Sequence, residues 1–347
     1  MDTVAIADDN PGYDITSHAE IVADSILISM TLEERVGQCL MPALYASSDK
    51  LNLQTFRQWI DDYHIGGVML MNGNLFSAKE IAEVASKTFP PLFVAIDAEW
   101  GLGMRLEDAP VYPKNGKISK EEEESHLYDY GREIAEEARK TGINMILGPV
   151  LDVVGPGKNI IGSRSFGENV DIVSNFGVAY SKGLESGKVI SIAKHFPGHG
   201  HAINDSHVTA AKSLQDISAM DSIDLRPFRD YINAGLSGVM AGHIQAQALD
   251  PSGKVASASE DIMKSLLREE MGFKGLIITD ALNMGGARGF SAADALKAGA
   301  DLILCPVNVK EEFQDILECI DNGSLKISDI NERCKRILFF KYLFGII

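Results

Sequence analysis

Residues 194–207, with the sequence KHFPGHGHAINDSH, concentrate side chains that can move protons. The stretch holds four histidines, one lysine and one aspartate within fourteen residues. An apolar run at 189–193 precedes it and predicts a buried strand, whereas Pro197, Gly198 and Gly200 predict a loop. Loops mounted on rigid strands can present side chains to a ligand. The stretch therefore predicts a functional site at a strand end, with a solvated polar loop as the alternative.

Asp205 and His207 lie two positions apart in this loop. In an extended or turn segment, side chains at i and i+2 can point the same way, so the carboxylate can orient the imidazole and raise its basicity. Because imidazole changes charge near neutral pH, His207 is a candidate general acid/base. A plain turn at 204–206 is the alternative interpretation.

The same loop admits a metal-binding interpretation, because His195, His199, His201 and His207 provide enough imidazoles for zinc. Their spacings are those of a loop, however, and not the i,i+4 pair of a helical site. We expect no metal and no other cofactor, with a metal-dependent hydrolase as an alternative. The four cysteines have no CxxC spacing and predict free thiols.

Other apolar runs also lead into chargeable residues. These are Asp97 with Glu99 and Arg105 following, Asp152, Lys194–His195, His243 and Asp280. In a parallel barrel the carboxyl ends of the strands share one face, so these residues predict one polar pocket. A carboxylate at the position of Asp280 can attack a carbon that develops positive charge. An N-cap or salt-bridge role is the alternative for Asp280.

Short apolar runs alternate with segments of helical periodicity along the whole chain. The eight runs are 37–44, 66–71, 91–97, 144–150, 189–195, 238–243, 275–280 and 301–306. Alternating βα units give parallel strands joined by right-handed crossovers. We therefore predict an α/β fold, a single (β/α)8 barrel domain over residues 1–347, with a loosely structured N-terminus at 1–15. The long loops follow the third and fifth strands.

An open doubly wound sheet is the alternative fold. It would require a phosphate-binding glycine loop after the first strand, and residues 44–48 do not provide one.

The composition excludes several partners. The formal net charge of -17 argues against a nucleic acid or an anionic membrane as partner. No apolar run reaches the roughly 18 residues that span a bilayer, and residues 1–10 lack the basic start of a signal peptide. We expect a cytoplasmic monomer or weak homodimer, with a periplasmic or secreted location as the alternative if a leader was trimmed.

With these residues identified, the chain resembles glycoside hydrolase family 3, and within it the single-domain β-N-acetylglucosaminidases. Residues 194–207 match the pattern K-H-F-P-G-x-G-x4-D-x-H in full. Residues 29–38 resemble the first helix of the family, and 336–338 resemble its closing helix. The resemblance covers nearly the whole chain.

The resemblance implies roles for individual residues. The family pattern I-x-[ST]-D-x-L-x-M, matched at 277–284, makes Asp280 the nucleophile, and the loop motif makes His207 the acid/base, oriented by Asp205. Substrate-binding residues of the family fall on Asp97, Arg105, Arg164, Lys194 and His195, and the strand-end His243 is a further candidate.

The implied enzyme is a retaining exo-β-N-acetylglucosaminidase that acts through a glycosyl-aspartyl intermediate. Its substrate would be a small carbohydrate with a terminal β-linked N-acetylglucosamine, in a glycoside or a muropeptide. A β-glucosidase or xylosidase of the same family and a non-catalytic sugar-binding protein are the alternatives.

Overall fold

Each predicted apolar run contains a parallel β-strand. The computed structural model describes residues 15–47, 52–121, 123–155, 160–206 and 208–347. Seven strands form one curled parallel sheet in the order β10-β8-β6-β5-β4-β3-β2. Their bounds are β2 Ala43–Ala46, β3 Gly67–Gly73, β4 Phe93–Ile96, β5 Met145–Ile146, β6 Ile190–Phe196, β8 Gly238–Ala241 and β10 Leu276–Thr279.

A separate two-stranded pair lies between the edges of this sheet. It consists of β1 (Leu40–Met41) and β11 (Ile303–Leu304). The Ile303 amide donates to Cys39 O at 2.8 Å, and the Thr279 amide donates to Leu302 O at 3.0 Å. The pair thus joins the β10 edge to the chain that enters β2, and the arrangement is barrel-like.

The first predicted strand is divided, so the barrel-like ring is not one uninterrupted ladder of eight strands. Pro42 separates β1 from β2 and has no amide hydrogen to donate. Its carbonyl still accepts from the Met69 amide at 2.8 Å. As a result β1 pairs with β11, whereas β2 pairs with β3.

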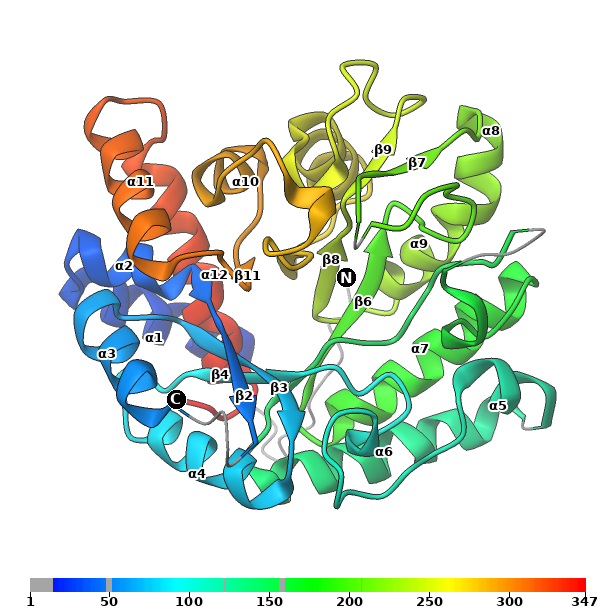
Figure 1. Ribbon diagram of the computed structural model, residues 1–347, viewed down its shortest axis with the longest axis horizontal. Helices are drawn as coiled ribbons and strands as arrows, with labels where there is room; N and C mark the ends of the chain where they lie inside the picture. Colours follow the sequence, from blue (N-terminus) through cyan, green and yellow to red (C-terminus); the bar gives the residue numbers. More distant parts are fainter. Residues whose placement is uncertain (1–14, 48–51, 122, 156–159, 207) are drawn as a thin grey trace.

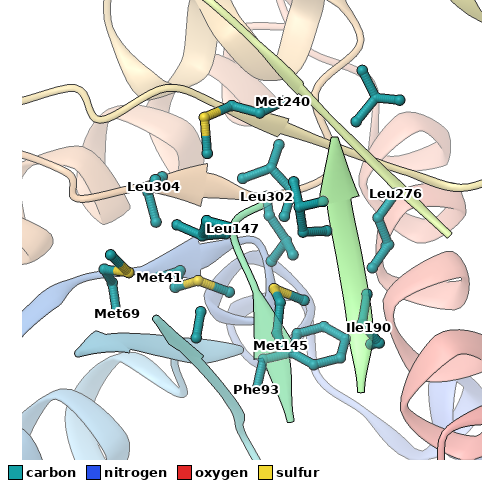
Figure 2. Close-up of a cluster of buried hydrophobic side chains, with 14 of the residues drawn as sticks. Met41, Met69, Phe93, Met145, Leu147, Ile190, Met240, Leu276, Leu302 and Leu304 are labelled. Atoms are coloured by element: carbon teal, nitrogen blue, oxygen red, sulfur yellow. The ribbon is translucent and has the colours of Figure 1, made fainter. Parts of the chain in front are cut away.

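The interior of the ring is filled by large apolar side chains. Figure 2 shows them converging from strands around the ring, and all are buried: Met41, Met69, Phe93, Met145, Leu147, Ile190, Met240, Leu276, Leu302 and Leu304. Close packing of this kind resists changes of volume. It supplies the rigid base on which the strand ends stand.

Helices surround the strands on the outside (Figure 1). The α-helices are α1 Ile15–Ser29, α2 Leu32–Gln38, α3 Leu53–Tyr63, α4 Leu75–Ser86, α5 Asn115–Glu121, α6 Glu124–Thr141, α7 Val170–Ser186, α8 Ile217–Ala219, α9 Arg226–Asn233, α10 Ala292–Ala298, α11 Val309–Asp321 and α12 Ile327–Leu343. Residues Asp261–Glu270 are wound as a π-helix, η5. No helix in the described part of the chain is long and apolar enough to cross a membrane.

Long connections follow β4 and β6, the third and fifth predicted strands, but an equally long one follows β5; the connection after β6 contains one extra strand. Strand β7 (Ala211–Ser213) pairs in parallel with β9 (Ile244–Ala246), which follows β8. In Figure 1 this pair lies beyond the end of β6, at the upper right. The predicted loose N-terminus at 1–14 lies outside the described residues, and residue 15 begins α1.

Candidate active site

The carboxyl ends of three strands carry the predicted acids and bases. Asp97 follows β4 directly and Asp280 follows β10 directly, whereas Lys194 and His195 are among the last three residues of β6. The peptide bond between Lys194 and His195 is cis. Because the strands are parallel members of one sheet, these side chains share one face of the molecule.

Lys194 lies between two carboxylates, with only 3% of its side chain exposed. Its Nζ donates to Asp97 Oδ1 at 2.8 Å and pairs with Glu99 Oε1 at 2.9 Å, while Arg105 donates to Asp97 Oδ2. Burial opposes ionisation, but the two carboxylates raise the pKa of Lys194. Burial likewise opposes the charge of Asp97, but Lys194 and Arg105 hold the pKa of that carboxyl well below its usual range.

Glu99 is fully buried and orients two cations. Besides Lys194, it receives two nearly parallel hydrogen bonds from Arg164, from Nη2 to Oε1 at 2.7 Å and from Nε to Oε2 at 3.0 Å. Such two-pronged bonds fix the plane of a guanidinium. The backbone of Arg164 is held in turn, because Asn115 Nδ2 donates to its carbonyl at 2.7 Å.

Asp152 organises the histidines that follow β6. Its Oδ2 accepts from His195 Nδ1 at 2.7 Å, and its Oδ1 accepts from the backbone amide of His199 at 2.6 Å. Because a carboxylate can only accept, Nδ1 of His195 carries a proton. Nε2 of His195 lies 3.4 Å from Arg164 Nη2 and can accept from it. Burial opposes the charge of Asp152, but His195 lowers the pKa of this carboxyl.

Asp280 is held as a buried carboxylate. Its Oδ1 accepts from the Ala281 amide at 2.8 Å. Burial alone would raise its pKa, but the charge that His243 and His195 can carry, the Ala281 amide and the Lys194 ammonium together lower it. A carboxylate kept ionised beside cations is chemically competent to attack an electrophilic carbon.

His243 has both ring nitrogens occupied by protein groups. Nε2 donates to the Ala281 carbonyl at 3.0 Å, and Nδ1 pairs with Ser257 Oγ at 2.7 Å. The side chain is buried. These two hydrogen bonds tie His243 to the turn after Asp280. They also occupy both ring nitrogens, which are then not available to a sugar hydroxyl.

The loop that carries the predicted acid/base pair is closed at its base. The Ile203 amide donates to Lys212 O at 3.1 Å, and Ala202 bridges to Ser213. Asp205 is exposed, and its carbonyl accepts from the amide of Val208 at 3.1 Å. His207 itself lies outside the described residues, so its predicted pairing with Asp205 stays a prediction.

The described zinc-ligand candidates each bond to a different polar side chain, although the rings of His195 and His199 are neighbours, with centroids 5.8 Å apart. His195 pairs with Asp152, His199 Nε2 pairs with Ser206 Oγ at 3.0 Å, and His201 Nδ1 pairs with Asp224 Oδ1 at 2.9 Å. Across the residues that the structure describes, which omit His207, no group of three His, Cys, Asp or Glu is arranged to hold a metal ion.

A cavity of about 660 Å³ lies at the opposite end of the strands and is remote from this chemistry. Its walls come from helix ends and from segments that precede β3 and β4, and include Met30, Gln38, His64, Phe89 and Leu92. In barrel enzymes the residues at this face serve stability, whereas the chemistry lies at the carboxyl ends of the strands.

The described geometry is that of a cluster of buried, paired charges and a buried carboxylate, Asp280, at the carboxyl ends of the strands. In agreement with this, the N-terminal domain of glycosyl hydrolase family 3 matches residues 31–340. The chain belongs to glycoside hydrolase family 3. Named relatives include a β-hexosaminidase of Nitrosomonas eutropha, 33% identical over 256 residues that cover 69% of this chain and 73% of the relative. A β-hexosaminidase of Neisseria meningitidis serogroup C is 33% identical over 291 residues, 78% of this chain and 79% of that one.

Solved structures of family 3 have the same fold. A β-N-acetylglucosaminidase of this family from Paenibacillus sp. superposes with a TM-score of 0.82 at 28% identity, covering 91% of this chain. This chain spans 63% of that longer protein. A family 3 glycosyl hydrolase from Mycobacterium smegmatis gives a TM-score of 0.82 at 28% identity, covering 90% of this chain and 98% of that one.

For this family 3 glycosidase, sequence reasoning noted Glu99 and Asp152 near strand ends but gave neither a role. The structure places Glu99 against Arg164, 65 positions away, and Asp152 against His195, 43 positions away. Their position after an apolar run was the available indication. The contact of His199 with Ser206 had no counterpart in the sequence analysis.

Proposed function

We propose that this family 3 glycosidase is a retaining exo-β-N-acetylglucosaminidase, that is, a β-hexosaminidase. The observation that carries the proposal is the ionised Asp280 beside the cluster of Asp97, Glu99, Lys194, Arg164 and His195, on a chain with the complete K-H-F-P-G-x-G-x4-D-x-H motif. The names of the relatives support the same substrate class.

In the proposed first half-reaction, a terminal sugar enters with its hydroxyls against Asp97, Lys194 and Arg164. These charged groups can donate to and accept from hydroxyls and thereby fix the orientation of the ring. One oxygen of Asp280 attacks the anomeric carbon while the bond to the leaving oxygen breaks. His207, protonated, transfers its proton to that oxygen and becomes neutral.

In the second half-reaction, neutral His207 removes a proton from water, and the water oxygen attacks the anomeric carbon. The bond to Asp280 breaks, the carboxylate returns and His207 is protonated again. Two inversions give overall retention of configuration. His243 serves this scheme by holding the Ala281 carbonyl next to the nucleophile.

The first test compares p-nitrophenyl β-N-acetylglucosaminide with p-nitrophenyl β-glucoside, with and without a chelator, and follows the product anomer by NMR. We expect turnover of the N-acetylglucosaminide, unaffected by the chelator, with the β-anomer formed first. Preference for the glucoside would contradict the substrate assignment and favour a β-glucosidase. Activity lost to the chelator and restored by zinc would contradict the proton-transfer role of the histidine loop.

The second test addresses the acid. His207→Ala should lower kcat by about 10²-fold or more on substrates with poor leaving groups, while 2,4-dinitrophenyl glycosides should be cleaved almost as fast in the glycosylation step. Equal loss on both kinds of substrate would show that His207 is not the proton donor.

A further inference from the structure

Ser206 is buried at the tip of an otherwise exposed loop. It is only 3% exposed, whereas Val208, two positions further, is 68% exposed. A buried hydroxyl and a buried carbonyl need partners, because an unpaired polar group costs free energy when it leaves water. The partners of Ser206 lie on two other parts of the site.

The side chain of Ser206 connects the loop to the proposed sugar-binding cluster, which consists of Asp97, Glu99, Lys194, Arg164 and His195. Its Oγ lies 3.0 Å from Nε2 of His199. The backbone amide of His199 donates to Asp152 Oδ1 at 2.6 Å, and Asp152 also holds His195. A continuous series of hydrogen bonds therefore runs from His195, beside the proposed sugar site, to the residue that precedes His207 in the chain.

The backbone of Ser206 connects the same loop to the turn after Asp280. The Gly286 amide donates to Ser206 O at 3.0 Å, and Gly286 belongs to η6 (Gly285–Ala287). This contact needs a glycine, because a Cβ on Gly286 would lie 2.7 Å from Ser206 O and 2.8 Å from His243 Cβ. The loop thus meets the segment of the nucleophile at van der Waals distance.

Burial disfavours the charged form of His199, at the other end of this connection. Burial and the nearby His195 lower the pKa of His199, and the carboxylates of Asp152 and Asp280 only partly oppose this. Its Nδ1 is buried with no hydrogen-bond partner among the described residues, so Nε2 makes the single side-chain bond of the ring.

We propose that Ser206 and His199 are positioning residues that set the location of the acid/base loop relative to both the sugar and Asp280. The proposal rests on the proposed function, in which His207 of this loop is the proton donor. Ser206 does not touch the reacting atoms in this scheme. It acts by holding the residue that precedes the donor, through its side chain to His199 and through its carbonyl to Gly286.

The test is Ser206→Ala, which removes the hydroxyl and keeps the carbonyl bond to Gly286. We expect kcat on a poor leaving group, such as an alkyl glycoside, to fall about tenfold because the donor is misplaced. kcat/KM of the 2,4-dinitrophenyl glycoside, which reports a glycosylation step that needs no proton donor, should be nearly unchanged. Ser213→Ala is the matched control, since Ser213 is a buried serine of the same loop that faces the Gln215 amide, and it should leave both rates unchanged.

A double-mutant cycle separates this proposal from the proposed function. If Ser206 acts through His207, Ser206→Ala should have no further effect in the His207→Ala background. His199→Gln, whose amide nitrogen reaches about as far as Nε2, should keep more activity on alkyl glycosides than His199→Ala.

Two outcomes would overturn the proposal about Ser206. One is an equal loss on both leaving groups, and the other is an undiminished effect of Ser206→Ala in the His207→Ala background. If His207→Ala alone showed no dependence on the leaving group, the assignment of the proton donor would fail instead. The two failures are therefore distinguishable.

Discussion

The sugar-binding cluster and the acid/base loop are held in place in different ways. In the cluster, Lys194 and Glu99 are buried and belong to a network of charged hydrogen bonds. This network lies at the ends of the packed strands. In the loop, Asp205 and Val208 are exposed, and Ser206 supplies the buried contacts of the tip. The cluster is rigidly held for the sugar recognition proposed above, whereas the loop depends on a few bonds for its position.

Because of this difference, substitutions in the two regions should affect sugar binding and proton transfer separately. A change in the cluster should impair both sugar recognition and stability, because removing one partner of an ion pair leaves the other charge buried and unpaired. A change in the loop should impair proton transfer and leave recognition intact. The four predictions below test that division, in order of decreasing effect.

The largest effect should come from the nucleophile, where the two regions meet. Asp280→Gly should lower kcat by about 10⁴-fold or more, because no group remains to form the covalent intermediate. Added azide should restore turnover and give a glycosyl azide of inverted configuration, detectable by NMR. Retained activity without azide would show that Asp280 is not the nucleophile.

The next effect concerns the cluster. Glu99→Gln should lower kcat/KM by about 100-fold, because Lys194 and Arg164 lose the charge that orients them, and should lower the free energy of unfolding by about 3 kcal/mol. Both are measurable, by kinetics and by denaturant unfolding.

Glu185→Gln is the matched control for the cluster. Glu185 is equally buried but accepts from Ser191 Oγ at 2.6 Å and from the Ser237 amide at 2.9 Å, and burial raises its pKa to about 7. A neutral amide should therefore cost less than about 1 kcal/mol there. Equal losses for the two variants would mean that burial, and not ion pairing, decides the effect.

A smaller effect should arise where the loop meets the turn of the nucleophile. Gly286→Ala places a methyl group against Ser206 O and His243, so the loop must shift at a cost of about 1–3 kcal/mol. We expect kcat/KM on alkyl glycosides to fall more than kcat/KM on dinitrophenyl glycosides, because only the alkyl glycosides need the proton donor in the glycosylation step. The inhibition constant of free N-acetylglucosamine should not change, and a weaker inhibition would show that the shift reaches the cluster.

The smallest effect concerns His201, whose hydrogen bond to Asp224 raises its pKa above the ordinary 6.5. A histidine with a raised pKa in the folded state adds stability that is complete below the unfolded pKa and is lost as the pH rises through the folded pKa. The stability difference between wild type and His201→Asn should therefore be larger near about pH 5.5 than near about pH 8.5, by up to about 1 kcal/mol. Unfolding at both pH values measures it, and a difference that grows with pH would contradict the assignment.

The strands and the family could be predicted because both are encoded locally. Short apolar runs, several of them preceded by glycines, mark the strands of the ring, and the fourteen residues from Lys194 to His207 carry the family motif without a gap. The division of the first strand also has a local cause, the missing amide hydrogen of Pro42. The π-helical winding of η5 and the β7–β9 pair were not predicted, since apolar periodicity specifies neither.

The partners of the polar residues could not be predicted, because they depend on the paths of long connections. Arg164 reaches Glu99 only when the segment after β5 folds back over the end of β4. His243 lies at a strand end, as predicted, yet Ser257 and the Ala281 carbonyl occupy its ring. Spacing in the sequence indicates which side chains share a face, but not which of them bond to one another.

The closed base of the acid/base loop has a consequence for the diversification of such enzymes. Because the Ala202–Ser213 bridge and the β7–β9 pair fix where the loop leaves and re-enters the scaffold, the intervening residues form a cassette. Its length and composition can change through insertion or grafting without altering the strand ends that recognise the sugar. Under the proposed function, new leaving groups could thus be acquired one loop at a time, while the preference for the sugar is kept.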